Sequence, residues 1–132
     1  MIYSSTNPGT AIDEAYQLAA NFDLSPDHIK PRVTCGIHWE LASVIDLTGE
    51  ALPSWLELTA WLREDFEKIN DAGTESLCQA FGRAARNSGI SGMFCPSVRV
   101  PNGINLVAFR DRLRRSDSMR VLGKEELDKY LA

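Results

Sequence analysis

The fold of this protein is decided by the stretch Gly89-Ile-Ser-Gly-Met-Phe-Cys-Pro-Ser97-Val-Arg-Val-Pro-Asn-Gly-Ile-Asn105-Leu-Val-Ala-Phe109-Arg110, which sets polar residues between two apolar runs. The apolar runs predict two short buried strands. Pro96 stops the first strand, and Pro101-Asn102-Gly103 predicts a tight turn. Ser97 and Arg99 lie at the break, and the end of a core strand is a common place for a binding site. A plain strand-turn-strand in which Ser97 satisfies a turn amide is the simpler interpretation of this stretch alone.

Outward from this stretch, alternating apolar residues predict strands, and apolar steps of three and four residues predict helices. The expected elements are a strand over 1–6, a helix to about 21, strands over 32–39 and 41–47 or one strand broken near 40, helices over 51–69 and 74–87, strands over 93–95, 104–109 and 119–122, and a helix over 124–131. This order predicts a mixed α+β fold rather than βαβ alternation. A length of 132 residues with 44% hydrophobic content predicts a single domain over residues 1–132.

The first helix carries a candidate for chemistry. Asn7 is expected to cap this helix, and Pro8 to occupy its first position. Glu14 borders the face that we expect to be buried. A carboxylate in the first turns of a helix is stabilised by the helix dipole, which would explain Glu14 without any function. The expected buried face consists of Ile12, Ala15, Tyr16, Ala19 and Phe22.

Charge and composition argue against several classes of protein. Fourteen basic and eighteen acidic residues give a net charge of −4, so nucleic acid is not the expected partner. No apolar run approaches the ~20 residues of a membrane helix, and the sequence predicts a soluble, cytoplasmic protein. Cys35, Cys78 and Cys95 are far apart and predict reduced thiols rather than a metal site. Walker, dinucleotide-glycine and nucleophile-elbow motifs are missing.

Four segments nevertheless follow one another in a recognisable order. The later two are Gln79-Ala-Phe-Gly82-Arg-Ala-Ala-Arg86 with Gly89-Ile-Ser-Gly92, and Cys95-Pro-Ser97-Val-Arg99 with Asn105-Leu-Val-Ala-Phe109. The earlier two are Ile2-Tyr3-Ser-Ser-Thr6 with Thr10-Ala-Ile-Asp-Glu14, and Val44-Ile-Asp-Leu-Thr48. Together they resemble the RES domain, a family named after its characteristic Arg, Glu and Ser residues. The resemblance spans roughly residues 2 to 110, and four segments in the right order make it fairly specific.

The resemblance implies a fold like that of mono-ADP-ribosyltransferases and the toxin of a bacterial type II toxin–antitoxin pair, with an Xre-like antitoxin as partner. NAD would be the substrate, cleaved at the nicotinamide–ribose bond by hydrolysis, phosphorolysis or ADP-ribosyl transfer, without a metal. Glu14 and Ser97 would be the catalytic residues, and Tyr3, Asn105 and Arg99 would contact the dinucleotide. A fixed carboxylate suits this chemistry, because the bond breaks through an oxocarbenium-like state.

One part of the family pattern has no counterpart here. The family's arginine lies upstream of the tyrosine strand, and this sequence begins two residues before Tyr3. Such an arginine is expected to grip the pyrophosphate, and Arg83 and Arg99 are candidates to replace it. An NAD-consuming toxin and a degenerate RES-like domain that binds an antitoxin or another protein without catalysis both stay open, as does a homo-oligomer. An unrelated α+β domain would place Glu14 and Ser97 far apart.

Overall fold

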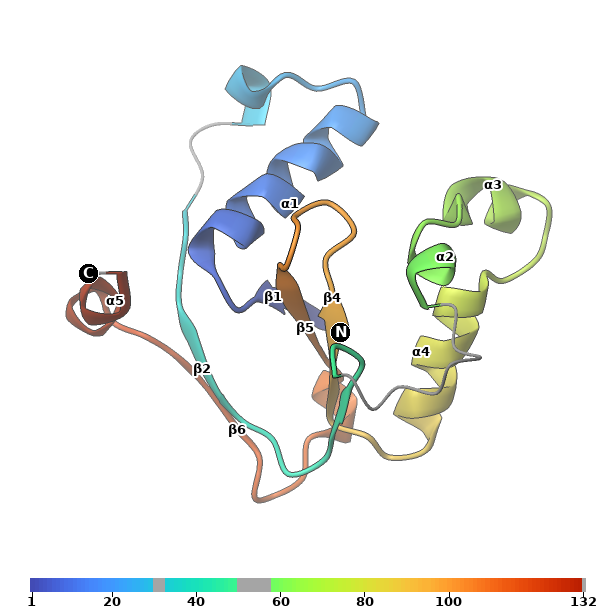
Figure 1. Ribbon diagram of the computed structural model, residues 1–132. Helices are drawn as coiled ribbons and strands as arrows, with labels where there is room; N and C mark the ends of the chain where they lie inside the picture. Colours follow the sequence, from blue (N-terminus) through green and yellow to red (C-terminus); the bar gives the residue numbers. More distant parts are fainter. Residues whose placement is uncertain (30–32, 50–57, 132) are drawn as a thin grey trace.

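The structure is a computed structural model that describes residues 1–29, 33–49 and 58–131, and it has a mixed α+β fold (Figure 1). The α+β class predicted from the sequence is confirmed, whereas the likeness to mono-ADP-ribosyltransferases stays a prediction. The described helices and strands are β1 (Ile2–Ser5), α1 (Pro8–Asn21), a 3₁₀ helix (Pro26–Ile29), β2 (Ile37–Glu40), β3 (Val44–Asp46), α2 (Leu58–Leu62), α3 (Phe66–Asp71), α4 (Leu77–Asn87), β4 (Gly92–Pro96), β5 (Ile104–Ala108), a 3₁₀ helix (Arg110–Arg112), β6 (Ser118–Val121) and α5 (Lys124–Leu131).

The main sheet has four strands in the order β1-β5-β4-β3. Strands β1, β5 and β4 are antiparallel neighbours, and β3 runs parallel to β4. The turn predicted between β4 and β5 is present, because Gly103 donates its N–H to the Val100 carbonyl at 2.9 Å and Asn102 has a φ of 60°. Asparagine is among the residues that tolerate this left-handed conformation best. The deciding stretch therefore forms the hairpin at the centre of the sheet, as predicted.

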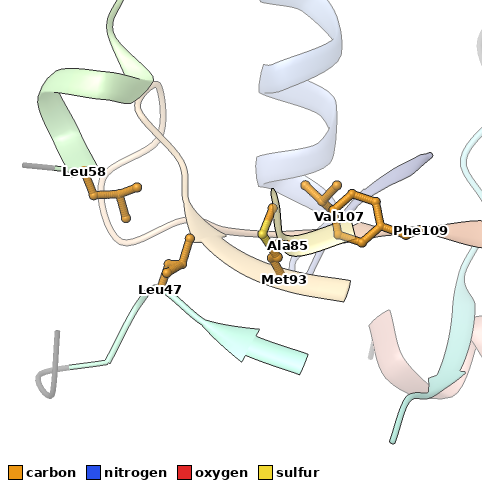
Figure 2. Packing of buried hydrophobic residues seen from close by; sticks show 6 residues of the cluster. All are labelled: Leu47, Leu58, Ala85, Met93, Val107 and Phe109. Atoms are coloured by element: carbon orange, nitrogen blue, oxygen red, sulfur yellow. The ribbon is translucent and has the colours of Figure 1, made fainter. Parts of the chain in front are cut away.

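One face of this sheet carries the main core. Register places Met93 of β4 opposite Val107 of β5 and beside Ile45 of β3, so these three side chains share a face. Helices α2 and α4 cover that face, because Leu58 and Ala85 belong to the same buried cluster. Figure 2 shows six side chains of this cluster, which come from widely separated parts of the chain: Leu47, Leu58, Ala85, Met93, Val107 and Phe109.

Helix α1 has the predicted bounds but a different buried face. Asn7 caps it, since the Asn7 Oδ1 accepts the Gly9 N–H at 2.8 Å. The prediction of a buried apolar stripe was wrong for Ile12, which is 42% exposed, and for Phe22, which is 64% exposed. Thr10, 4% exposed, points inward instead. The physical reason is that α1 packs against the β4–β5 hairpin through polar side chains rather than through apolar ones.

The helix predicted over residues 51–69 is interrupted. In the described part of that range α2 ends at Leu62, and α3 begins after Asp65, whose Oδ1 accepts the Lys68 N–H at 3.1 Å. An N-cap residue of this kind starts a new helix and so breaks the apolar periodicity that suggested one element. Helix α4 also begins at Leu77 rather than at Thr74, because Ser76 forms a capping box with Gln79.

Strands β2 and β6 form a separate two-stranded antiparallel sheet. Of the two alternatives left open by the sequence, two separate strands is thus the correct one, and β2 and β3 belong to different sheets. Asp117 fixes the junction between these sheets, because its carboxylate accepts the Ala42 N–H at 2.7 Å, the Arg114 N–H at 2.7 Å and the Ser91 hydroxyl at 2.8 Å. All four residues of β6 are exposed.

Candidate active site

The carboxylate of Glu14 connects α1 to the β4–β5 hairpin, two segments that lie next to each other in Figure 1. Its Oε1 atom accepts the Ser97 hydroxyl at 2.6 Å and the Asn105 Nδ2 at 2.9 Å. Its Oε2 atom pairs with the Arg99 Nε at 3.2 Å. The Glu14 side chain is 26% exposed, so the carboxylate is held by two hydrogen bonds and one ion pair at a site that still reaches solvent.

The Ser97 hydroxyl both donates and accepts hydrogen bonds. Its Oγ accepts the N–H groups of Val100 at 3.0 Å and Arg99 at 3.2 Å while it donates to Glu14. A serine that closes its own turn in this way is held rigidly. The simple interpretation of Ser97 as a turn residue is therefore correct, and the same turn aims its proton at Glu14. We infer that Ser97 positions Glu14 and does not act as a nucleophile.

The amide of Asn105 is oriented by a second serine. Ser5 donates its hydroxyl to the Asn105 Oδ1 at 2.6 Å, which leaves the Nδ2 group free to donate to Glu14. Register explains the contact, because Ser5 lies opposite Asn105 in the β1–β5 ladder. The sequence interpretation missed Ser5, although its place two residues after Tyr3 on the same strand puts both side chains on one face.

A cavity of about 610 Å³ opens beside the Glu14 carboxylate, within the size range of ligand pockets. It lies between α1, β1 and the start of α3. Phe66, the first residue of α3, is 50% exposed and lines this cavity. The described residues that line it are Tyr3, Ser4, Ser5, Ala11, Glu14, Ala15, Phe66, Arg99 and Asn105.

Tyr3 contributes an aromatic surface to this cavity. The Tyr3 side chain lines the cavity and the residue is 71% exposed, although the surrounding protein partly desolvates the phenol. This partial burial, followed by the neighbouring thiols of Cys78 and Cys95, raises the pKa of the Tyr3 phenol above its usual value. Tyr3 is therefore uncharged at neutral pH and suits stacking and hydrogen bonding rather than proton abstraction.

The two thiols near Tyr3 are not activated. Burial, and then the proximity of Cys78, raises the pKa of Cys95 to about 11, and burial also raises the pKa of Cys78. Thiolates are the reactive form of cysteine, so neither side chain is a nucleophile at neutral pH. Both cysteines and the exposed Cys35 are free thiols, in agreement with the expectation of reduced cysteines.

A second, smaller cavity of about 280 Å³ is lined largely by residues at the β4–β5 hairpin. Ser97 and Arg99 belong to its lining, and Arg99 lines both cavities. Arg63, from the connection between α2 and α3, supplies a second cation that no sequence motif indicated. The residues of the described part of the chain that line it are Leu62, Arg63, Pro96, Ser97, Val98, Arg99 and Pro101.

Other residues of the four quoted segments have structural roles. Gln79 accepts the Ser76 N–H at 3.1 Å in the capping box of α4. Arg83, a candidate to bind the pyrophosphate, forms a bidentate ion pair with Glu75 at 2.8 to 3.2 Å. It lines neither described cavity. Asp46 accepts the N–H and the hydroxyl of Thr48 at 2.8 and 2.5 Å, which closes a turn after β3.

The five residues predicted for the site are thus brought together by the tertiary structure. Tyr3, Glu14, Asn105 and Arg99 line the larger cavity, and Ser97 reaches it through its bond to Glu14. Among residues 1–29, 33–49 and 58–131, no group of three or more His, Cys, Asp or Glu side chains is arranged to hold a metal ion. Over the same ranges, no helix is both long and apolar enough to traverse a bilayer.

Comparison with known proteins gives one finding. No curated protein and no solved structure matches this chain significantly. The model of the RES domain family matches residues 1–128 of the 132. This match covers both elements that carry the Glu14 cluster, α1 and the β4–β5 hairpin. The chain therefore belongs to the RES domain family.

Proposed function

We propose that this protein is a toxin that consumes NAD by breaking the bond between nicotinamide and ribose. Membership of the RES domain family suggests a role associated with a toxin–antitoxin pair. The substrate, the similarity to mono-ADP-ribosyltransferases and an Xre-like antitoxin as partner are part of the proposal. One observation carries it: the Glu14 carboxylate is held by Ser97, Asn105 and Arg99 at the wall of a cavity that also contains the Tyr3 ring.

A carboxylate fixed in this way suits the chemistry. Cleavage of an N-glycosidic bond places positive charge on the ribose, and a preorganised carboxylate stabilises that charge without reorganising. Ser97 and Asn105 supply the preorganisation, because each is held by a further partner: the turn amides for Ser97, and Ser5 for Asn105. Nicotinamide leaves as a neutral molecule, so the reaction asks for no strong general acid.

The remaining lining fits the leaving group and its ribose. Tyr3 and Phe66 give the cavity aromatic surfaces, and an aromatic face holds a planar ring such as nicotinamide in a fixed pose. Ser4 and Ser5 provide hydroxyl groups nearby. In this arrangement Glu14 faces the ribose, Tyr3 contacts the nicotinamide side, and water, phosphate or a protein group accepts the ADP-ribosyl group.

The test is release of nicotinamide from NAD by the purified chain, compared with Glu14→Gln. Glutamine keeps an oxygen for Ser97 and Asn105 but removes the charge, so we expect a fall in the rate of about 10²–10³-fold with little change in thermal stability. Asp13→Asn is the matched control, because Asp13 is the neighbouring exposed carboxylate on the same helix. Equal, negligible release by the unmodified chain and by Glu14→Gln would instead support the non-catalytic alternative.

A further inference from the structure

The smaller cavity at the hairpin has two arginines in its lining, and one of them, Arg99, also forms an ion pair with Glu14. Arg63 and Arg99 both line it, and none of the other described residues in its lining is acidic. In the described part of the chain no ion pair joins Arg63 to an acidic side chain. A cavity with two cations and no acid in its wall attracts an anion, and arginine binds phosphate oxygens through paired hydrogen bonds.

Arg99, which forms an ion pair with Glu14, is the one partner of that carboxylate that can leave without disturbing the rest of the cluster. Ser97 is fixed by two turn amides, and Asn105 is fixed by Ser5. The side chain of Arg99 has no such anchor beyond Glu14, and it is 34% exposed between the two cavities. Partly exposed ion pairs are weak, so an incoming anion can compete for this guanidinium.

We propose that the smaller cavity is a phosphate-binding subsite in which Arg63 and Arg99 are the ligands, and that Arg99 exchanges Glu14 for the phosphate when the subsite fills. The inference rests on the proposed function for the identity of the phosphate, which belongs either to the diphosphate of the dinucleotide or to free phosphate acting as the acceptor. In both cases the exchange leaves Glu14 with one oxygen freed toward the larger cavity. Occupation of the subsite thereby exposes the carboxylate that acts on the ribose.

The experiment measures binding rather than turnover, by calorimetry with ADP, inorganic phosphate and adenosine as probes. We expect ADP to bind at least about tenfold more tightly than adenosine, because only ADP carries the phosphates that two arginines recognise. Arg63→Gln should weaken ADP binding about tenfold and leave adenosine unchanged. Arg83→Gln is the matched control, since Arg83 is already paired with Glu75, and it should bind ADP as the unmodified chain does.

If Arg99 exchanges Glu14 for phosphate, removing the Glu14 charge should change the affinity for ADP, whereas a purely structural ion pair predicts no such change. Glu14→Gln removes the competitor for Arg99, so ADP should bind about two- to fivefold more tightly to this variant even though cleavage is lost. Arg99→Gln should weaken ADP binding to a similar extent as Arg63→Gln. Thermal denaturation of each variant shows whether it is folded.

The three probes distinguish the diphosphate of the dinucleotide from free phosphate. They also distinguish failure of the phosphate subsite from failure of the proposed NAD cleavage. ADP binding that depends on Arg63 assigns the subsite to the diphosphate, whereas Arg63-dependent binding of inorganic phosphate without ADP binding assigns it to a free phosphate. Either result stands even if no nicotinamide is released, in which case only the proposed NAD cleavage fails. Binding of ADP and phosphate that is unchanged in Arg63→Gln and Arg99→Gln overturns the subsite, whether or not NAD is cleaved.

Discussion

Two carboxylates in this protein each have three polar partners, but the partners are of different kinds. Asp117 accepts two backbone N–H groups, from Arg114 and Ala42, together with the Ser91 hydroxyl. Glu14 interacts only with side chains: it accepts hydrogen bonds from Ser97 and Asn105 and forms an ion pair with Arg99. Neither described cavity is lined by Asp117, whereas Glu14 lines the larger one.

The difference separates a structural carboxylate from a functional one. Backbone donors belong to the fold itself, so Asp117 cannot exchange partners without local unfolding. Side-chain donors can rotate away, so the Glu14 cluster can admit a ligand while the fold persists. A buried or half-buried carboxylate with several donors is therefore not evidence of function by itself, and the kind of donor and the adjoining space decide between the two roles.

The largest effect is expected where the hairpin contacts α1. A Cβ at Gly103 would lie 2.9 Å from the Thr10 Cγ2 and 3.1 Å from the Ser97 Cβ. Gly103→Ala should therefore push the hairpin away from α1, lower the free energy of unfolding by about 1–3 kcal/mol and reduce NAD cleavage as strongly as the loss of Glu14. Denaturation and nicotinamide release measure the two consequences.

Gly82→Ala is the control for this substitution. Gly82 lies inside α4, and a Cβ there would meet no atom within 4 Å. Alanine in a helix interior is more favourable than glycine, so this variant should gain about 0.5–1 kcal/mol with unchanged cleavage. A Gly103→Ala variant that is as stable and as active as the unmodified chain would show that the hairpin does not need to contact α1 closely.

The next effect compares the two serines that donate to the two carboxylates. Ser91, fully buried, donates to Asp117, and Ser97 donates to Glu14. Ser91→Ala should lower the free energy of unfolding by about 1 kcal/mol and leave cleavage unchanged, whereas Ser97→Ala should lower kcat about tenfold. Nicotinamide release and denaturation are measured for both variants. If both substitutions changed the same property, the proposed difference between Asp117 and Glu14 would be wrong.

The smallest effect is a dependence on pH. The backbone N–H groups of Arg114 and Ala42, and then the Ser91 hydroxyl, lower the pKa of the Asp117 carboxyl in the folded protein. A carboxyl whose pKa is lower in the folded state stabilises the fold above its unfolded pKa of about 3.9, and this contribution is lost as the pH falls through the folded pKa. The difference in denaturation midpoint between the unmodified chain and Asp117→Asn should therefore be constant above about pH 5 and shrink below pH 4. A difference that grew on acidification would contradict the role assigned to Asp117.

Local sequence signals predicted the elements whose ends are marked by a capping residue, a proline or a turn. The bounds of α1 follow from Asn7 and Pro8, and the hairpin follows from Pro96 and the turn at 101–103, so both were predicted closely. The long helix over 51–69 was predicted wrongly because apolar periodicity continues across the cap at Asp65. Ala51 and Trp55 of that prediction lie outside the described residues.

The candidate site could be predicted only through resemblance to a family. In the sequence, Glu14 is a carboxylate near a helix start and Ser97 is a turn serine, and each has an ordinary structural explanation. Their spacing of 83 residues carries no information about their distance in space. The roles of Ser5, Phe66 and Arg63 were missed for the same reason, since their contacts depend on neighbours that are remote in sequence.

The sequence by itself determined the α+β class, the hairpin around residues 97–103 and the start of α1, because caps, prolines and turn residues act over a few positions. Only the tertiary structure decided that β2 leaves the main sheet, that Thr10 and Glu14 rather than Ile12 face the hairpin, and that Arg99 lies between two cavities. These outcomes depend on which surfaces meet, and residues far apart along the chain compete for each surface through packing and hydrogen bonds that no local pattern records.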